Sequence, residues 1–479
     1  MKFLLLRPAY QEEKNKSHNI TSRNLHPLGL LYIGASLEND GHEVELLDYY
    51  AEKITKDKLK NSLMSCDAVG MTVSTNNYKP AADISRLIKE IDSDIPLIIG
   101  GPHCTFVQNQ SLHDIPYADI SVMGEGEYVI LDLAKYLQGE KNLANIHGIY
   151  YKENGSIISG KPPKVINNLD ELPFPARHLV EKYDHGNFSF GHTFKGKITN
   201  LITSKGCPFH CRFCSRYHHF IKDWSFRKRS AENVVNEIQE LSGKYRSVII
   251  VDDNFLADKK RAHKIFDMLL ESNTGIEFLI QGARVDTADK ELYLKMKKAG
   301  VKYIFYGLES GNQDVLDFYN KNITLQQIKK ATTLARQMDF FIGASFIFGA
   351  PMETKNHIEN TIKFACSLPL DNAIFVPLIY RTGSSLWMEA VKNKKIQPNQ
   401  YEVLADSSHN LSNFTEEELI EHTSNAINSF YFRPSYIFEQ IFKIFLRKDY
   451  SMLINGTKYL ILFNKIKEAS IEIIKSKRI

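Results

Sequence analysis

Three cysteines fall within eight residues in the stretch Thr203-Ser204-Lys205-Gly206-Cys207-Pro208-Phe209-His210-Cys211-Arg212-Phe213-Cys214. The stretch directly follows the predicted strand Ile198–Thr203. A loop of this length can wrap three sulfurs around one corner of a cubane. Structural zinc sites and fully ligated iron–sulfur clusters take four ligands, so three leave one metal position open for a substrate or cofactor. The alternative is a Cys3His zinc site completed by His210, His218 or His219.

Six β/α units run through residues 198–390. The other strand candidates are Ser247–Val251, Ile276–Gln281, Tyr303–Gly307, Phe341–Phe348 and Ala373–Pro377, separated by amphipathic stretches such as Ala231–Leu241, Lys260–Leu270, Lys290–Ala299 and Leu325–Met338. This alternation predicts a partial (β/α)6 barrel with its active site at the C-terminal mouth of the strands. Residues 391–479 are predicted to be a helical C-terminal region without obvious chemistry.

The N-terminal part, residues 1–140, alternates in the same way. Its predicted strands are Lys2–Arg7, Glu43–Asp48, Ala68–Val73, Leu97–Gly100 and Ile120–Met123, and its predicted helices are Leu28–Asn39, Lys56–Met64, Ala81–Ile91 and Tyr128–Leu137. Near-continuous apolar strands indicate a doubly wound, five-stranded parallel sheet covered on both faces. Such sheets bind ligands at the carboxyl ends of their strands. Residues 141–197 are rich in turn formers and predict a linker with a small hairpin.

Composition excludes several classes of protein. Of the 479 residues, 43% are hydrophobic and 24% charged, which excludes disorder and fibrous repeats. The net charge of +4 is too small to argue for binding to a nucleic-acid backbone. The apolar run at the N-terminus is too short for a signal peptide, and no stretch approaches a membrane span. We therefore expect a cytoplasmic protein whose cysteines are thiols or metal ligands.

The cysteine pattern, with Phe213 before the last cysteine, resembles the radical S-adenosylmethionine (radical SAM) superfamily. The resemblance implies that Cys207, Cys211 and Cys214 hold a [4Fe-4S] cluster whose unique iron chelates the methionine moiety of S-adenosylmethionine. It also implies SAM-binding roles for Phe213, for Asp252 and Asp253 near the amino group, for Arg284 at the carboxylate, for Glu309 and Ser310 at the ribose, and for Gly349 near adenine. Taken singly, the acidic residues could cap a helix and the glycine could be an ordinary turn residue.

The N-terminal part resembles the cobalamin-binding module that precedes the barrel in one radical SAM subgroup. The implied contacts are Ser74, Thr75, Gly100, Gly101, His103, Gly124 and Gly126. Small residues at strand ends allow backbone to approach a broad corrin ring. The pattern Asp-x-His-x-x-Gly is absent, so cobalamin is expected to bind without a protein histidine on cobalt. Two alternatives stay open: His103 is a loop histidine bonded to backbone, or the domain has kept its fold without a cofactor.

The tail segment Phe430–Tyr436 resembles a Phe-Tyr-x-Arg-Pro segment of some cobalamin-binding members. The aromatic and lysine-containing stretches after it, Ile437–Phe445 and Tyr459–Lys467, favour core packing over membrane-surface or dimer contact.

The resemblance implies a cobalamin-dependent radical SAM enzyme that methylates an unactivated carbon of a small-molecule biosynthetic intermediate. An electron donor such as flavodoxin or ferredoxin would supply the reducing electron. One alternative is radical oxidative cyclisation or rearrangement without methyl transfer, and another is a cobalamin- or metal-binding regulatory protein. A methylthiotransferase is disfavoured because the N-terminal part lacks a second cysteine triad. The substrate itself is not defined by the sequence.

Overall fold

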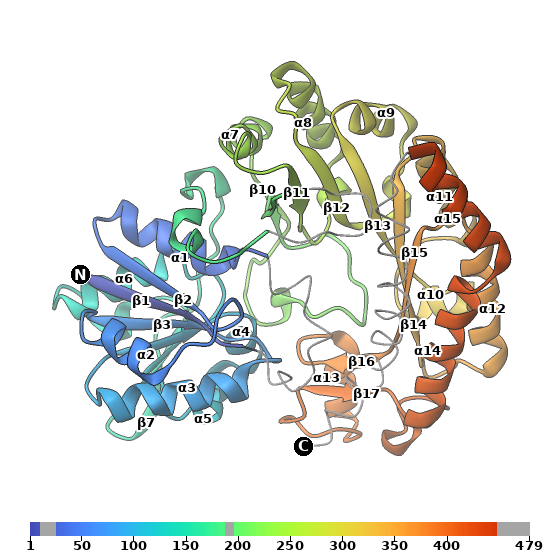
Figure 1. Cartoon of the computed structure of the whole chain (residues 1–479). Helices are drawn as coiled ribbons and strands as arrows, with labels where there is room; N and C mark the ends of the chain where they lie inside the picture. The colour runs from blue at the N-terminus through green and yellow to red at the C-terminus, as the bar shows by residue number, and fades with distance from the viewer. Residues whose placement is uncertain (10–24, 187–195, 448–479) are drawn as a thin grey trace. The chain divides into compact units, whose positions relative to one another are not determined.

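The computed structural model describes residues 1–9, 25–186 and 196–447 (Figure 1). Within them, the chain forms two compact units. The first comprises residues 1–9, 25–186 and 216–229, and the second comprises residues 196–215 and 230–447. Residues 216–229 therefore belong to the first unit although their neighbours in sequence belong to the second. The predicted domain boundaries at 140, 197 and 390 stay predictions.

The first unit is built on one seven-stranded sheet in the order β2-β1-β3-β4-β5-β6-β7. The five predicted parallel strands are confirmed as β1 (Lys2–Arg7), β2 (Glu43–Asp48), β3 (Ala68–Thr72), β4 (Leu97–Gly100) and β5 (Ile120–Val122). The hairpin predicted in the linker continues this sheet with antiparallel strands β6 (Ile149–Glu153) and β7 (Ser156–Ser159). Asn154 and Gly155 form its two-residue turn with φ of 50° and 78°, as a type I′ turn requires.

The sheet is buried on both faces. Along β1, Leu4 and Leu6 pack on the face covered by helices α2 (Lys56–Leu63) and α3 (Tyr78–Ile91). Phe3 packs on the other face, with α1 (Leu28–Asn39) and α6 (Val129–Leu137). Side chains alternate along a strand, so a continuous apolar run fills both layers. The shorter helices α4 (Pro102–Val107) and α5 (Ser111–Asp114) follow β4.

The second unit contains the predicted series of six β/α units. Its parallel strands are β8 (Ile198–Leu201), β11 (Ser247–Ile250), β12 (Glu277–Ala283), β13 (Val301–Glu309), β14 (Phe341–Phe348) and β15 (Asn372–Pro377), with β15 and β8 at the two edges. The helices are α7 (Ala231–Leu241), α8 (Lys259–Ser272), α9 (Lys290–Lys298), α10 (Gln313–Phe318), α11 (Leu325–Gln337) and α12 (Lys355–Ser367). The curved sheet has these helices on its outer side (Figure 1).

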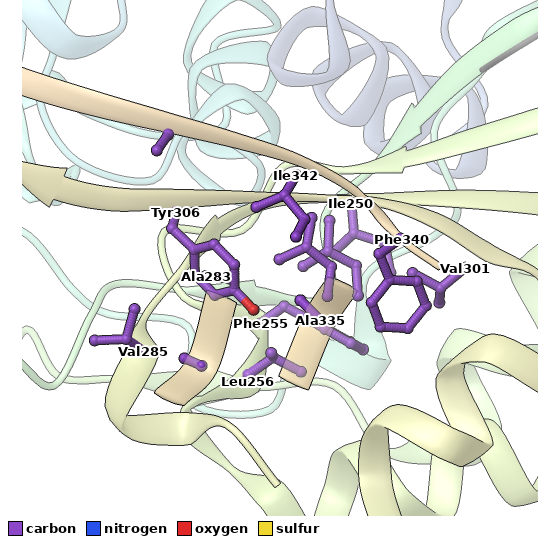
Figure 2. Close-up of a cluster of buried hydrophobic side chains, with 14 of the residues drawn as sticks. Ile250, Phe255, Leu256, Ala283, Val285, Val301, Tyr306, Ala335, Phe340 and Ile342 are labelled. Carbon is purple, nitrogen blue, oxygen red and sulfur yellow. The ribbon is translucent and has the colours of Figure 1, made fainter. Parts of the chain in front are cut away.

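Between this sheet and the outer helices lies the largest hydrophobic core. Figure 2 shows strand residues such as Ile250, Tyr306 and Ile342 meeting Phe255, which follows β11, and Ala335 of α11. This core fixes the strands, and their carboxyl ends carry the predicted SAM-binding residues.

The described part of the predicted helical C-terminal region, residues 391–447, contains α14 (Glu416–Tyr431) and α15 (Pro434–Arg447), and α13 (Ser385–Lys392) ends at its predicted start. Strands β16 (Ile379–Arg381) and β17 (Glu402–Leu404) also pair antiparallel and were not predicted. Their three-residue length gives too little alternation to reveal them in the sequence. Among the described residues, no helix is long and apolar enough to cross a membrane.

Candidate active site and cofactor face

The cysteine loop follows β8 and is held by the chain around it. Backbone hydrogen bonds tie Arg212 to both sides: its N–H donates to the Tyr319 carbonyl at 3.0 Å, and its carbonyl accepts from the Leu386 N–H at 3.1 Å. The Asn320 side chain donates to the His210 carbonyl at 2.8 Å. The loop conformation therefore rests on the protein's own bonds.

The three predicted cluster ligands differ in exposure: Cys211 is buried, Cys207 is partly buried and Cys214 is exposed. Among the residues the structure describes, no three His, Cys, Asp or Glu side chains gather closely enough to hold a single metal ion. A cubane places each thiolate on a different iron, so it does not need its ligands to converge on one ion.

Two cations accompany the Cys211 thiol. The Arg284 guanidinium has Nη1 3.9 Å from Cys211 Sγ and lies over the Phe209 ring at 3.6 Å. It also pairs with Asp286 at 2.9 Å and donates to the Lys321 carbonyl at 2.7 Å. Positive charge beside the cysteine loop suits a cluster whose protein ligands are anionic thiolates. This donor set fits the implied iron–sulfur cluster.

The second cation, Lys321, was not singled out from the sequence. Its Nζ lies 2.7 Å from Glu309 Oε1, and both side chains are less than a tenth exposed. Burial opposes its charge, but the Glu309 carboxylate and Cys211 outweigh this and raise the pKa of Lys321. Ser345 Oγ donates to the other Glu309 oxygen at 3.2 Å.

The end of β13 is shaped around this ion pair. A Cβ at Gly307 would lie 2.4 Å from Glu309 Oε1 and 2.9 Å from Lys321 Nζ, so the pair needs glycine there. Glu309 itself has φ of 68°, an unfavourable backbone conformation for a residue with a side chain. Such strain is concentrated at functional sites.

The predicted SAM residue Asp252 faces the start of the cysteine loop. Its carboxylate accepts hydrogen bonds from the Thr203 N–H at 2.6 Å, the Thr203 hydroxyl at 2.5 Å and the Ser204 hydroxyl at 2.6 Å. It is 3% exposed, and burial raises its pKa. Because Thr203 and Ser204 directly precede the cysteines, Asp252 sets the position of that loop.

A better-placed group for a ligand follows two residues later. Asn254 is fully buried, and neither atom of its carboxamide has a hydrogen-bond partner in the structure. Buried polar groups are nearly always bonded, so such an amide calls for a partner that binds there. Asp253 lies between these two residues and is exposed.

The remaining predicted SAM residues are Phe213 within the cysteine loop, Ser310 directly after β13 and Gly349 directly after β14. Phe213 packs edge-on against Tyr319 at 5.2 Å, and Ser310 is buried with its hydroxyl 3.2 Å from that of Thr361. Gly349 has φ of 105°. Its N–H and that of Ala350 donate to Glu353 Oε2 at 2.6 and 2.8 Å. Burial raises the pKa of Glu353 to about 7. The structure thus places Arg284 beside Cys211, Lys321 beside Glu309, and Phe213, itself part of the cysteine loop, against Tyr319.

The predicted cobalamin residues lie at the carboxyl ends of three strands of the first unit. Ser74 and Thr75 follow β3, Gly100 and Gly101 end β4, and Gly124 and Gly126 follow β5. Gly101 has φ of 116°, and a Cβ there would lie 2.7 Å from the Val73 carbonyl. The Ser74 hydroxyl is buried without a hydrogen-bond partner. The Gly101 backbone, which leaves no room for a side chain, and the unsatisfied Ser74 hydroxyl both lie at the strand ends where such sheets bind ligands. These features fit a bound ligand.

His103 is directed into the domain. It is fully buried, its Nε2 lies 3.1 Å from Asp114 Oδ2, and its ring stacks on Tyr78 at 4.9 Å. These contacts favour the structural alternative for this histidine, although its partner is a carboxylate and not backbone. They are also compatible with cobalamin binding that uses no protein histidine.

A segment far along the chain completes this end of the first unit. Arg227, in the two-residue strand β10 (Arg227–Lys228), donates through Nη1 to Glu125 Oε2 at 2.7 Å and to the Ile166 carbonyl at 2.6 Å. A Cβ on Gly124 would lie 2.8 Å from Ile221 Cδ1. Tyr217 packs against Phe106 of α4 at 5.0 Å. No local pattern in the sequence signals this long-range pairing.

Comparisons with known proteins match both parts of the chain. Residues 201–365 match the family model of the radical SAM superfamily, and residues 21–134 match that of the B12 binding domain. An uncharacterised methyltransferase of Pyrococcus horikoshii is 32% identical over 451 residues, covering 92% of this chain and 95% of that protein. A cytidylyl-2-hydroxyethylphosphonate methyltransferase of Streptomyces wedmorensis is 26% identical, covering 83% of each.

The fold has a solved counterpart in the cobalamin-dependent S-adenosylmethionine radical enzyme OxsB with aqua-cobalamin bound. The TM-score is 0.72 at 19% identity, covering 99% of this chain and 72% of that one. The chain is an enzyme of the cobalamin-binding radical SAM class. It belongs to the radical SAM superfamily and carries a B12-binding domain ahead of the radical SAM domain.

Proposed function

We propose that this protein methylates an unactivated carbon of a small-molecule biosynthetic intermediate. The observation that carries the proposal is the group formed by Arg284, Lys321 and Glu309 beside Cys211, in a chain that also has a B12-binding domain. When bound, the cluster and cobalamin supply reductive cleavage of S-adenosylmethionine and carriage of a methyl group.

The chain's own residues bind the cluster and S-adenosylmethionine and hold the cysteine loop in position. Cys207, Cys211 and Cys214 hold the cluster, while Arg284 and Lys321 present positive charge to the carboxylate of S-adenosylmethionine. Glu309 accepts from its ribose hydroxyls, and Asn254 bonds a polar group of the same ligand. Asp252 keeps the cysteine loop in place through Thr203 and Ser204.

The first unit holds cobalamin at the ends of β3, β4 and β5. The Ser74 hydroxyl and the exposed backbone at Gly101 and Gly124 lie against the ligand. If cobalamin binds there, no histidine of the protein would ligate its cobalt. Electron paramagnetic resonance of the cob(II)alamin form tests this: splitting from an imidazole nitrogen of the protein contradicts it, and failure to bind cobalamin supports a domain that kept only its fold.

The decisive experiment uses anaerobically reconstituted enzyme, a reductant such as flavodoxin or ferredoxin, and S-adenosylmethionine labelled at its methyl group. Candidate substrates come from the pathway encoded by neighbouring genes. Methyl transfer predicts label in methylcobalamin and then in product, with S-adenosylhomocysteine and deoxyadenosine both formed. Deoxyadenosine formed with an unlabelled product rejects methyl transfer and favours cyclisation or rearrangement.

A further inference from the structure

Helix α15 (Pro434–Arg447) turns its polar side toward the protein and its apolar side outward. Tyr436 Oη donates to the Asp371 carbonyl at 2.8 Å, and Lys443 Nζ donates to Asp371 Oδ1 at 2.5 Å. Glu439 pairs with Arg336 of α11 at 3.6 Å. These residues recur at helical spacing on one face, so ionic and polar contacts dock the helix.

The opposite face is apolar and exposed. Phe438 is 71% exposed, Phe442 63%, Ile437 42% and Ile441 40%. Figure 1 shows α15 on the outer side of the second unit, next to α11. A helix of a soluble protein normally buries its apolar stripe and exposes its charges. In α15 this arrangement is reversed over two consecutive turns. An exposed apolar face of this kind is typical of a surface that binds an apolar partner. The expected core packing is therefore wrong for these four side chains, and the second stretch, Tyr459–Lys467, lies outside the described residues.

The charge of the chain next to α15 indicates the nature of this apolar partner. Residues 448–479, which continue directly from α15, contain seven Lys and Arg against three Asp and Glu. Their net charge of +4 equals that of the entire chain, so residues 1–447 are balanced. Exposed phenylalanines joined to a basic segment are typical of helices that lie in the interface of an anionic bilayer. A second copy of the chain is disfavoured, since dimerisation would bring two basic segments together.

We propose that α15 docks the enzyme on the surface of an anionic membrane, with Phe438 and Phe442 entering the boundary between headgroups and acyl chains. The interaction is peripheral: the apolar face supplies burial, and the basic segment supplies attraction to anionic headgroups. This inference goes beyond the proposed methyl transfer and does not depend on it.

The test is flotation of the full-length protein with phosphatidylcholine vesicles, with and without phosphatidylglycerol. The protein should float only with the anionic vesicles, and added salt should release it because screening weakens the headgroup attraction. Phe438→Ser/Phe442→Ser should weaken the partition at least about tenfold, because two buried aromatic side chains are lost. Both residues are exposed, so the variant should keep its thermal stability.

The matched control is Leu270→Ser/Leu294→Ser, which removes two exposed leucines from α8 and α9. It should bind vesicles like the wild type. Failure of the wild type to float with anionic vesicles, or equal binding by the phenylalanine variant, overturns the proposal. So does a wild-type dimer that the phenylalanine variant dissociates. Hydroxyl-radical footprinting that finds the Phe438 and Phe442 side chains already protected without vesicles also overturns it, because the chain's own tail would then cover the face.

Discussion

Replacing Lys321 by methionine tests the centre of the proposed SAM site. The substitution keeps the length of the side chain and removes its charge, leaving the Glu309 carboxylate buried without its cation. Breaking a buried ion pair on one side costs about 3–5 kcal/mol. At a few degrees per kcal/mol for a domain of this size, the melting temperature should fall by roughly 10 °C.

The double variant Lys321→Met/Glu309→Gln separates stability from binding. Neutralising both partners removes the uncompensated charge, so the double variant should be more stable than Lys321→Met alone. Its affinity for S-adenosylmethionine should nevertheless stay low, because both proposed contacts are gone. The control is Lys302→Met, at an exposed position of β13, the strand that ends at Glu309. It should change neither stability nor affinity.

The assays are thermal unfolding and equilibrium dialysis with S-adenosylmethionine, both on anaerobically reconstituted protein. A double variant that regains wild-type stability and also wild-type affinity would show that the pair is purely structural. A Lys321→Met protein as stable as the wild type would refute the argument from burial.

Three further predictions address the surrounding groups. Cys207→Ala, Cys211→Ala or Cys214→Ala should abolish the brown colour and iron content after reconstitution, whereas Cys366→Ala should not; equal iron in all four would contradict the ligand assignment. Because burial raises the pKa of Glu353 to about 7, this residue keeps its proton in the folded protein up to about that pH. The stability it contributes is therefore complete below the unfolded pKa and is lost as the pH rises through the folded one. Relative to Glu353→Gln, the wild type should lose on the order of 3 kcal/mol between about pH 5 and 8, measured by urea unfolding; a constant difference would contradict this. Asp252→Asn should cost about 2–4 kcal/mol and lower the iron content, because an amide cannot accept all three hydrogen bonds, and Asp253→Asn should do neither.

Strand and helix positions were predictable where the apolar pattern was long. The predicted strand Phe341–Phe348 is β14 itself and Tyr303–Gly307 lies within β13, whereas the three-residue strands β16 and β17 are too short to give a pattern. The cysteine spacing likewise identifies the cluster loop without any tertiary information.

The ion pair was harder to foresee. Glu309 was singled out by the family resemblance of the segment that contains it, but Lys321 is one of many lysines and comes twelve residues later, in the connection between α10 and α11. Only folding shows that it is buried against Glu309 and Cys211. In the same way, Asp252 and Asn254 look alike in sequence, and only burial and hydrogen bonding separate a residue that fixes the loop from one with unmet bonds.

The return of Arg216–Arg229 to the first unit constrains how the protein can be made. A fragment that ends at Gly186 would lack Arg227 and leave the buried Glu125 carboxylate without its cation. On the ribosome, the first unit cannot be completed until Arg229 has emerged, and by then all three cysteines of the loop have already been synthesised. The cobalamin-binding unit can therefore be completed only once the cluster ligands are already outside the ribosome.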